Sequence, residues 1–475
     1  MRRAILVFGP FVLFAGAVFA CEDDSGLPSS PTFLLDGSTA TFDGNQAPFD
    51  GAAPDAEEDA EPDAPVVIPA VSVTVVGKTG PSADVRVVFH DADGAVLETK
   101  LTGADGKATR SAGAAPAMAS ALLAVAGQRQ IMTWTGVEDG DQLVVRDLEP
   151  YEETSGGSFA VALPGAFSDA GASGYEIVAG ECFTFTESSQ TATLPLMPYC
   201  TRGAKSSVLV RAKSYEGELV GHSFSKGNNV PTNGATVAVA TGVWRVPASV
   251  TLSVSNVPPD TEGNAELLEI SDGHGYPSGS VGLSQPATLQ TATGFADALQ
   301  ATASISSGQQ GWAKRVIAKR GAPAASITLD AALFLPPISG AEISANDAAR
   351  PVVSWTSTST AAADGGLVRV RYYTADETSS SWTFVVAPGS TSVKAPAMPA
   401  EAESFLPDPT NDSPSRFSRP TVVFIEADTI PSYALFRRTQ SAIADYAFPF
   451  ASYALPPLPT NGTYRATAFS QGEVR

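Results

Sequence analysis

Short runs in which apolar and polar residues alternate recur along the chain from about residue 70 onward. The run at 71–75 alternates valine with serine and threonine, and similar runs follow at 85–89 and 96–101. Asp93-Gly94 separates the last two of these runs, and Asp105-Gly106 follows the third. Alternation with a period of two predicts half-buried strands, and Asp-Gly between strands predicts a tight hairpin turn because glycine accepts positive φ.

Further strands are predicted at 208–210, 236–240 and 250–254, again from short β-branched runs. The alanine-rich stretch 114–127 is compatible instead with a brief helix. Because many short strands occur without long helical periodicity between them, the sequence predicts an all-β chain of tandem antiparallel sandwiches.

About 405 residues follow the first 70, which is enough for three or four domains of ordinary size. The predicted organisation begins with a signal peptide and a disordered acidic tether, and continues with β units. The segments are 1–20 (signal peptide), 21–68 (tether), 69–150, 151–240, 241–341 and 342–475, with 151–240 and 241–341 left open as one unit or two.

The unit 69–150 resembles the Ig-like repeats of bacterial surface proteins. Three stretches carry the resemblance: the strand at 85–89, the Gly-Ala-Asp-Gly turn within 101–108, and the Gly-Asp-Gln-Leu segment at 140–143. The resemblance implies a β-sandwich.

The last unit resembles a fibronectin type III domain over about 80 residues. The strand at 351–355 ends in Trp355 and matches the early core-tryptophan strand, while 368–372 and 382–386 match later strands. The region 407–420 is predicted to be an inserted loop. Two runs at 422–426 and 464–469 either finish the sheet or add to it.

The N-terminus carries an export signal that ends at a cysteine. Arg2 and Arg3 precede an apolar stretch from 4 to 19, which is typical of a signal peptide. At the end of this stretch, Val18, Ala20 and Cys21 resemble the lipobox of bacterial lipoproteins, although Phe19 replaces the usual small residue. The resemblance implies cleavage before Cys21 and lipid attachment to its sulfur, so that the lipid bilayer is a partner. The alternative is an ordinary signal peptide that leaves Cys21 as a free thiol.

The segment after Cys21 is acidic. Residues 22–68 contain 12 Asp and Glu but no Lys or Arg, out of a net charge of −21 for the whole chain. Pro, Gly, Ala and Ser fill most of the remainder, so the segment is predicted to be a disordered stalk. A calcium-binding or docking tail is the alternative. Acidic residues at 22–24 are similar to signals that send some lipoproteins to the cell surface and retain others at the inner membrane, with the outer membrane favoured here.

The chain has only two other cysteines, Cys182 and Cys200. An even pair in an exported protein predicts a disulfide, here across a hairpin that turns near 188–190. Two cysteines without a nearby histidine cannot fill a tetrahedral zinc site, so no metal is predicted.

The sequence offers no convincing catalytic or cofactor-binding set. His90, His222 and His274 are widely separated. The stretch 221–225 approaches a hydrolase nucleophile elbow, but Ser225 occupies the final glycine position, so a surface hairpin is predicted instead. The acidic stretches 91–94 and 138–141 are predicted to be turns rather than calcium loops, with a calcium ion at one of these turns left open.

Nucleic-acid binding is not expected, because the net charge of −21 repels phosphate. The basic positions Lys314-Arg315, Lys319-Arg320 and Arg437-Arg438 are predicted to lie on solvated faces. The five tryptophans are spread along the body and are predicted to fill cores. A sugar-binding platform requires exposed aromatic rings grouped on one face.

Taken together, these features predict a non-enzymatic lipoprotein of the bacterial cell envelope, facing either the outside or the periplasm, with a binding, adhesion or structural role. Its ligand is a protein or a glycan. The alternatives are an envelope hydrolase or glycan-processing enzyme sited on residues 151–341, and an accessory subunit of a secretion or uptake complex. A deep cleft with converging carboxylates favours the enzyme, whereas exposed aromatic side chains favour binding.

Overall fold

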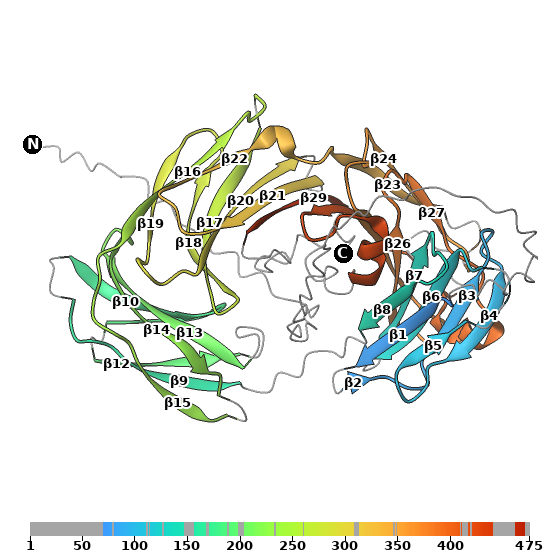
Figure 1. Cartoon of the computed structure of the whole chain (residues 1–475), viewed down its shortest axis with the longest axis horizontal. Coiled ribbons are helices and arrows are strands. Elements are labelled where there is room, and N and C mark those ends of the chain that lie inside the picture. The colour runs from blue at the N-terminus through green and yellow to red at the C-terminus, as the bar shows by residue number, and fades with distance from the viewer. Residues whose placement is uncertain are drawn as a thin grey trace, which may run out of the picture.

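The alternating runs form strands, and the computed structural model is all-β along nearly all of its length (Figure 1). It describes residues 70–475 except 78–79, 111–112, 114, 126–127, 147–155, 168–170, 188–189, 198–203, 232–233, 260, 308–312, 345–346, 348, 409, 411–416, 419, 440–460 and 471–475. Cys21, the signal peptide and the acidic tether lie outside the described residues, so lipidation and disorder stay predictions. The described part contains no helix that is long and apolar enough to cross a membrane.

The strands group into four sandwiches, here called the first to the fourth in chain order. Around the arch in Figure 1 they lie in the order second, third, fourth, first. Tandem β-sandwiches are therefore confirmed as the fold class. The domain boundaries given above stay a prediction.

The first sandwich confirms the hairpin turn at Asp93-Gly94, which joins the paired strands 86–90 and 96–101. The turn at Asp105-Gly106 is not a hairpin, because the strands 96–101 and 107–109 that it connects belong to different sheets. Gly94 and Gly106 adopt φ of +78° and +70°. The predicted helix is also corrected. Residues 118–125 form a strand, because Ala119, Ala121 and Leu123 alternate into the core and their backbone pairs with both neighbouring strands. Tertiary pairing thus overrides the helical preference of alanine. One sheet contains β1 (Ser72–Gly77), β2 (Gly80–Pro81), β5 (Lys107–Thr109) and β8 (Gln142–Arg146), and the other β3 (Arg86–His90), β4 (Val96–Leu101), β6 (Met118–Val125) and β7 (Gln128–Thr135).

The second sandwich corrects the predicted hairpin between the two cysteines. The two strands on either side of residues 188–190 belong to different sheets, because β11 (Cys182–Thr186) pairs with β10 (Ala172–Ala179) whereas β12 (Thr191–Leu196) pairs with β9 (Gly157–Ala162). The chain therefore crosses from one layer to the other at this point. The first layer contains β10 (Ala172–Ala179), β11 (Cys182–Thr186), β13 (Lys205–Ser214) and β14 (Leu219–Asn229), and the second β9 (Gly157–Ala162), β12 (Thr191–Leu196) and β15 (Thr236–Ala240).

The third sandwich packs a three-stranded sheet on a four-stranded layer. The small sheet contains β16 (Ala248–Ser255), β19 (Ala287–Thr291) and β22 (Ser326–Asp330), and the larger layer β17 (Gly263–Ser271), β18 (His274–Gly282), β20 (Ala298–Ser307) and β21 (Ala313–Gly321). A 3₁₀ turn, η2 (Ala331–Leu333), ends this part of the chain.

The fourth sandwich contains the stretches that resemble fibronectin type III strands. Its small sheet contains β23 (Ile338–Ser344), β24 (Val352–Ser357) and β27 (Ser392–Lys394), and its larger layer β25 (Gly365–Tyr373), β26 (Ser379–Val386), β28 (Thr421–Ala427) and β29 (Gly462–Ser470). The 3₁₀ helix η3 (Ala400–Phe405) and a short helix at 433–439 complete it. The two late runs of the sequence thus join the sheet as β28 and β29.

One twelve-stranded sheet runs through three of the sandwiches. Its order is β18-β17-β20-β21-β29-β28-β25-β26-β7-β6-β3-β4. The third and fourth sandwiches join where β21 pairs antiparallel with β29, and the fourth and first join where β26 pairs in parallel with β7. Backbone hydrogen bonds therefore link these three sandwiches directly.

The second and third sandwiches meet through side chains instead. Val178 and Leu209 pack against Tyr276 and Phe295, whose rings meet edge-on at 4.8 Å. Core filling is confirmed for Trp134, Trp355 and Trp382, which are all buried. Trp244 is half-buried and stacks on Tyr175 at 5.5 Å, whereas Trp312 lies outside the described residues.

Candidate functional site

The three histidines are buried at separate places. His90 Nε2 lies 3.0 Å from Ser120 Oγ, His222 Nε2 lies 3.1 Å from the Thr293 carbonyl oxygen, and His274 Nε2 lies 3.3 Å from that of Lys205. Burial lowers the pKa of His222 below its usual value, and the hydrogen bond to Thr293 opposes the shift. Within the described ranges, no three His, Cys, Asp or Glu side chains are grouped so as to hold a metal ion.

The stretch 221–225 is not the predicted surface hairpin, because it runs through the buried middle of β14. His222 and Ser223 are fully buried, and Ser223 Oγ donates to the Gly242 carbonyl oxygen at 2.6 Å. His222 is buried against Thr293 of the third sandwich, whereas Ser223 faces the interior of the second sandwich. The polar sequence of this stretch gave no sign of this burial.

The two acidic stretches are turns, as predicted. Asp91 Oδ1 accepts from the backbone nitrogens of Asp93 and Ala95 at 3.0 and 2.8 Å. Asp141 Oδ2 accepts from the backbone nitrogen of Glu138 and lies 2.8 Å from Arg437 Nη2.

The prediction of a solvated face is wrong for Arg437. Its side chain is only 1% exposed, because it lies between Asp141 and the Tyr433 ring. Arg438, by contrast, is about half exposed at 47%. On the other basic stretch, Arg320 donates two hydrogen bonds to the Gln300 side-chain oxygen.

Only one cysteine of the predicted disulfide lies among the described residues. Cys182 is buried at the start of β11, where its sulfur accepts a hydrogen bond from the Met197 backbone nitrogen at 3.2 Å. Cys200 lies outside the described residues, so the pairing of Cys182 with Cys200 stays a prediction.

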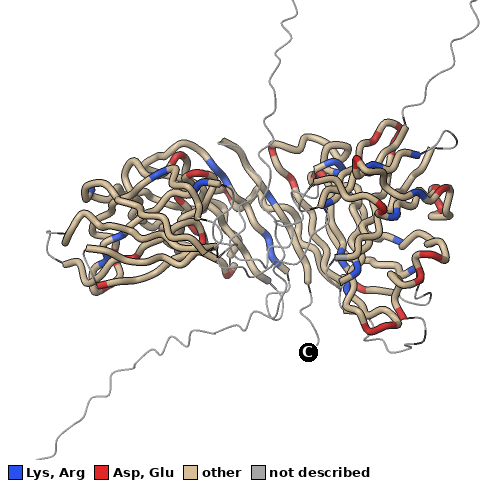
Figure 2. Tube along the Cα trace, turned by 90° about the horizontal axis from the view of Figure 1, so that it is seen from below, with Lys and Arg blue, Asp and Glu red and all other residues tan. Residues whose placement is uncertain are grey.

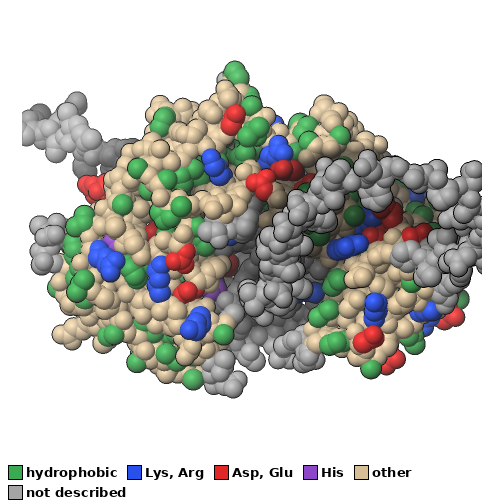
Figure 3. Space-filling model, viewed as in Figure 1, with side chains coloured by type: hydrophobic (Ala, Val, Ile, Leu, Met, Phe, Trp, Pro, Cys, Tyr) green, Lys and Arg blue, Asp and Glu red, His purple; other side chains and the backbone are tan. Residues whose placement is uncertain are grey.

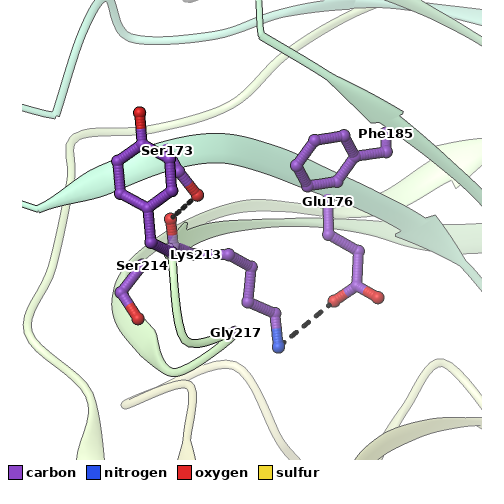
Figure 4. A pocket seen from close by; sticks show the side chains of 7 residues that line it. Ser173, Glu176, Phe185, Lys213, Ser214 and Gly217 are labelled. Atoms are coloured by element: carbon purple, nitrogen blue, oxygen red, sulfur yellow. Dashed lines mark hydrogen bonds and ion pairs between the residues drawn. The ribbon is translucent and has the colours of Figure 1, made fainter. Parts of the chain in front are cut away.

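A candidate binding site lies on the outer face of the second sandwich, over β10, β11 and β13 (Figure 4). The inner face of this layer, including Tyr175 and Ile177, packs into the core. Cross-strand register places Phe185, Glu176 and Arg211 in one row on the outer face, and Val178 and Leu209 in the next. The third sandwich covers Val178 and Leu209, whereas Phe183, at the β11 end of that row, and Phe185 remain exposed.

Two phenylalanines on β11 point away from the core. Phe183 and Phe185 are 72% and 57% exposed, whereas Cys182 on the alternate face is buried. Large apolar side chains at outward positions are informative because folding alone gives no reason for them.

The Phe185 ring lies across a glycine of the neighbouring strand. A Cβ atom at Gly174 would lie 2.2 Å from Phe185 Cζ, so only glycine leaves room for the ring in this position. Gly174 is therefore a positioning residue for Phe185.

A third exposed ring is held beside this face by a tight turn. Gly217 N donates to the Ser214 carbonyl oxygen at 2.9 Å, and Gly217 adopts a φ of +81°. Ser214 Oγ also accepts from the backbone nitrogens of Glu216 and Glu218. This turn presents Tyr215, which is 93% exposed.

Paired charges lie between the rings. Lys213 Nζ lies 3.7 Å from Glu176 Oε2 (Figure 4). Arg211 Nη1 lies 3.3 Å from the same oxygen. Burial lowers the pKa of the Lys213 ammonium, while the Glu176 carboxylate opposes that shift. Arg211 also reaches the fully buried Glu269 of the third sandwich at 3.4 Å.

Together these groups form a shallow hollow of about 380 Å³, here called the β10–β13 hollow. It is lined by Ser173, Glu176, Phe185, Lys213, Ser214, Tyr215 and Gly217. It offers aromatic faces, one carboxylate, one ammonium and hydroxyl groups, which suits reversible binding of a partly apolar, partly hydroxylated ligand.

Sequence reasoning did not single out this hollow. The signal was present in Cys182-Phe183-Thr184-Phe185-Thr186, where phenylalanine and threonine alternate. Alternation alone places the phenylalanines inward and the threonines outward. Only the register with β10 and the burial of Cys182 reveal the opposite orientation.

Other exposed apolar side chains of the described residues include Leu101 on β4 and the pair Val243 and Val246. Acidic and basic positions are interspersed along both ends of the arch (Figure 2). On the face shown in Figure 3, hydrophobic side chains are scattered rather than gathered into one broad patch.

Comparisons with known proteins give only distant similarity. No protein family and no curated protein matches the sequence. Among solved structures, the chain is similar to the Bacillus anthracis TIE protein at 10% identity and a TM-score of 0.15, covering 55% of this chain and half of that one. It is also similar to the major pilin protein T-13 from Streptococcus pyogenes at 7% identity and a TM-score of 0.09, covering 50% of this chain and 98% of the pilin. At such scores these similarities carry no argument about function.

Proposed function

We propose that this protein is a lipid-anchored, non-enzymatic binding protein of the bacterial cell envelope, which holds its ligand in the β10–β13 hollow. Cys21 attaches it to a bilayer, the outer membrane in preference to the inner, and the acidic segment 22–68 spaces the sandwiches from that surface. The outward orientation of Phe183 and Phe185 carries the proposal.

Two further observations support a binding role. The hollow is shallow and contains the single carboxylate of Glu176, whereas general acid–base hydrolysis of glycosides uses a pair of flanking carboxyl groups. The buried contact between the second and third sandwiches supports the layer that carries the hollow.

Anchoring is tested by metabolic labelling with a fatty-acid probe. The wild type should carry the label and Cys21→Ala should lose it. Label that persists in Cys21→Ala contradicts attachment at this sulfur. Protease shaving of intact cells then shows on which side of the membrane the sandwiches lie, since only surface-exposed sandwiches are cut.

The binding role is tested with whole cells. Cells that display the wild type should adhere to a host-matrix or biofilm-matrix surface more strongly than cells that display the double variant Phe185→Ala/Tyr215→Ala. Tyr373→Ala is the matched control, because Tyr373 is 59% exposed but lies on the fourth sandwich. Equal adhesion by wild type and double variant contradicts a role for the hollow.

A further inference from the structure

We propose that the ligand of the β10–β13 hollow is a short segment of an uncharged pyranose polysaccharide. This inference rests on the binding role proposed above and names the chemical class that the hollow recognises. The hollow supplies the two kinds of contact that a sugar chain requires, exposed aromatic faces and paired polar groups.

The aromatic contact comes from Phe185 and Tyr215. A pyranose ring in its chair form presents a face of C–H bonds, which packs on the π-face of an aromatic side chain. The absence of a side chain at Gly174 leaves room for the Phe185 ring, and the turn at 214–217 fixes the backbone that carries Tyr215.

The polar contact comes from Glu176 and Lys213. Glu176 Oε2 faces both Arg211 and Lys213, so its second oxygen is available as an acceptor. The Lys213 ammonium carries three donors. A carboxylate acceptor beside an ammonium donor is suited to neighbouring hydroxyl groups, each of which both donates and accepts.

The charges favour an uncharged ligand. Glu176 is balanced by Lys213 and Arg211, and Arg211 in turn by the buried Glu269. The hollow thus holds no large excess of either sign, while the net charge of −21 on the whole chain repels polyanions at long range.

The size of the hollow fits a segment rather than an enclosed small molecule. A volume of about 380 Å³ lies toward the lower end of the range for small-ligand sites, about 300–1,000 Å³. Because the rings of Phe185 and Tyr215 stand largely in solvent, a polymer can lie across them and continue past both.

The test is affinity electrophoresis of the full chain in gels that contain amylose, laminarin, galactomannan or, as a polyanion, alginate. At least one neutral polysaccharide should retard the wild type and alginate should not. Phe185→Ala should raise the dissociation constant obtained from the retardation about tenfold, the loss expected for one aromatic stacking contact. Tyr373→Ala should migrate as the wild type does.

Gly174→Ala is the second variant, because it changes no lining side chain. Its methyl group should displace the flexible Phe185 ring and weaken binding by a similar factor while the thermal unfolding midpoint stays close to that of the wild type. Unchanged binding by Gly174→Ala or by Phe185→Ala overturns the inference.

The outcomes separate this inference from the binding role itself. If no neutral polysaccharide retards the wild type while the hollow variants still reduce whole-cell adhesion, the glycan is excluded and the binding role stands. If the hollow variants change neither the retardation by a polysaccharide nor whole-cell adhesion, both proposals are overturned. Retardation by alginate alone would assign the hollow to an acidic polymer and overturn the uncharged class.

Discussion

Arg129 on β7 and Asp376 in the turn between β25 and β26 form two parallel hydrogen bonds of 2.7 Å, although 247 positions separate them in the chain. This pairing lowers the pKa of the Asp376 carboxyl well below its usual range. It marks one edge of the junction where the fourth sandwich returns to the first, and where β26 lies parallel to β7.

The interior of that junction should contribute more to stability than its exposed ion pair. Trp382 is fully buried, and its Nε1 donates to Thr133 Oγ1 at 2.9 Å. Trp382→Phe removes this donor and leaves a small cavity, so we expect the free energy of unfolding to fall by about 2–4 kcal/mol. Urea denaturation of the full chain measures the change.

Hydrogen exchange shows whether the junction couples the two sandwiches. Because β7 and β26 share backbone hydrogen bonds, amides of β6 and of β25 should lose protection together in Trp382→Phe. Arg129→Gln serves as the comparison, since exposed ion pairs contribute little. Loss of protection in β25 alone would contradict a shared unit.

Strand β29 should be required for the sheet to remain continuous. It pairs with β21 on one side, from Ala313↔Phe469 to Arg320↔Gly462, and with β28 on the other. A chain that ends before Gly462 exposes two long edges, which are templates for intermolecular pairing. We expect oligomers or aggregates by size-exclusion chromatography with light scattering.

The matched control for this truncation is a chain that ends at Ser470, which keeps all of β29. It should remain as dispersed as the full chain. A monomeric, folded protein without β29 would show that β21 and β28 do not depend on it.

Much of the fold could be predicted from sequence, because alternation and Asp-Gly turns are local signals. The strands at 71–75 and 85–89 and the turns at Gly94 and Gly106 illustrate this. The pairing of β21 with β29 and of β26 with β7 could not be predicted, because alternation identifies a strand without naming its partner. Distant pairings are decided by the packing of the whole chain.

The site was hidden for a related reason. Period two assigns two faces to β11 but does not say which face is inside, and hydrophobicity alone chooses the wrong one for Phe183 and Phe185. His222 and Arg437 were misplaced in the opposite direction, because their burial is offset by partners from distant elements, the Thr293 carbonyl and Asp141.

The contact between the second and third sandwiches should depend on a buried ion pair. Arg211 is 4% exposed and Glu269 is fully buried, where Glu269 also accepts from the Ala292 backbone nitrogen at 2.7 Å. Arg211→Met leaves the carboxylate uncompensated, so the free energy of unfolding should fall by about 3–5 kcal/mol. Denaturant titration of the full chain tests this.

A double variant distinguishes the energy lost with the ion pair from the cost of leaving one buried charge without its partner. Arg211→Met/Glu269→Gln should be more stable than Arg211→Met alone, because the amide needs less solvation than the carboxylate. If the double variant is instead less stable by the sum of both single effects, the two side chains do not interact.

The predicted disulfide should join Cys182, at the start of the strand that carries Phe183 and Phe185, to Cys200. Cys182 begins β11, and linking it to Cys200 closes a loop whose constraint contributes about 3 kcal/mol in the chain-entropy model. Peptide mapping without reductant should recover the cross-linked peptides. Recovery of both cysteines as free thiols would refute the bond.

Stability should also fall in mild acid because of His90. Burial lowers the pKa of His90 from 6.5 to about 4, with Asp91 opposing the shift and Arg350 adding to it. Between these two values the unfolded chain binds a proton that the folded chain does not, so unfolding is favoured as the pH falls. The loss of unfolding free energy should be small above pH 6.5 and reach about 3 kcal/mol near pH 4.

His90→Gln tests this because glutamine keeps a polar contact for Ser120 and does not titrate. The difference in unfolding free energy between wild type and variant should change by about 3 kcal/mol from pH 7 to pH 4. Asp364, whose raised pKa of about 6 gives a slope of opposite sign, is present in both proteins and cancels in the difference. Parallel pH profiles for the two proteins would show that His90 is protonated as readily in the folded chain as in the unfolded one, and that its buried contact with Ser120 does not hold it neutral.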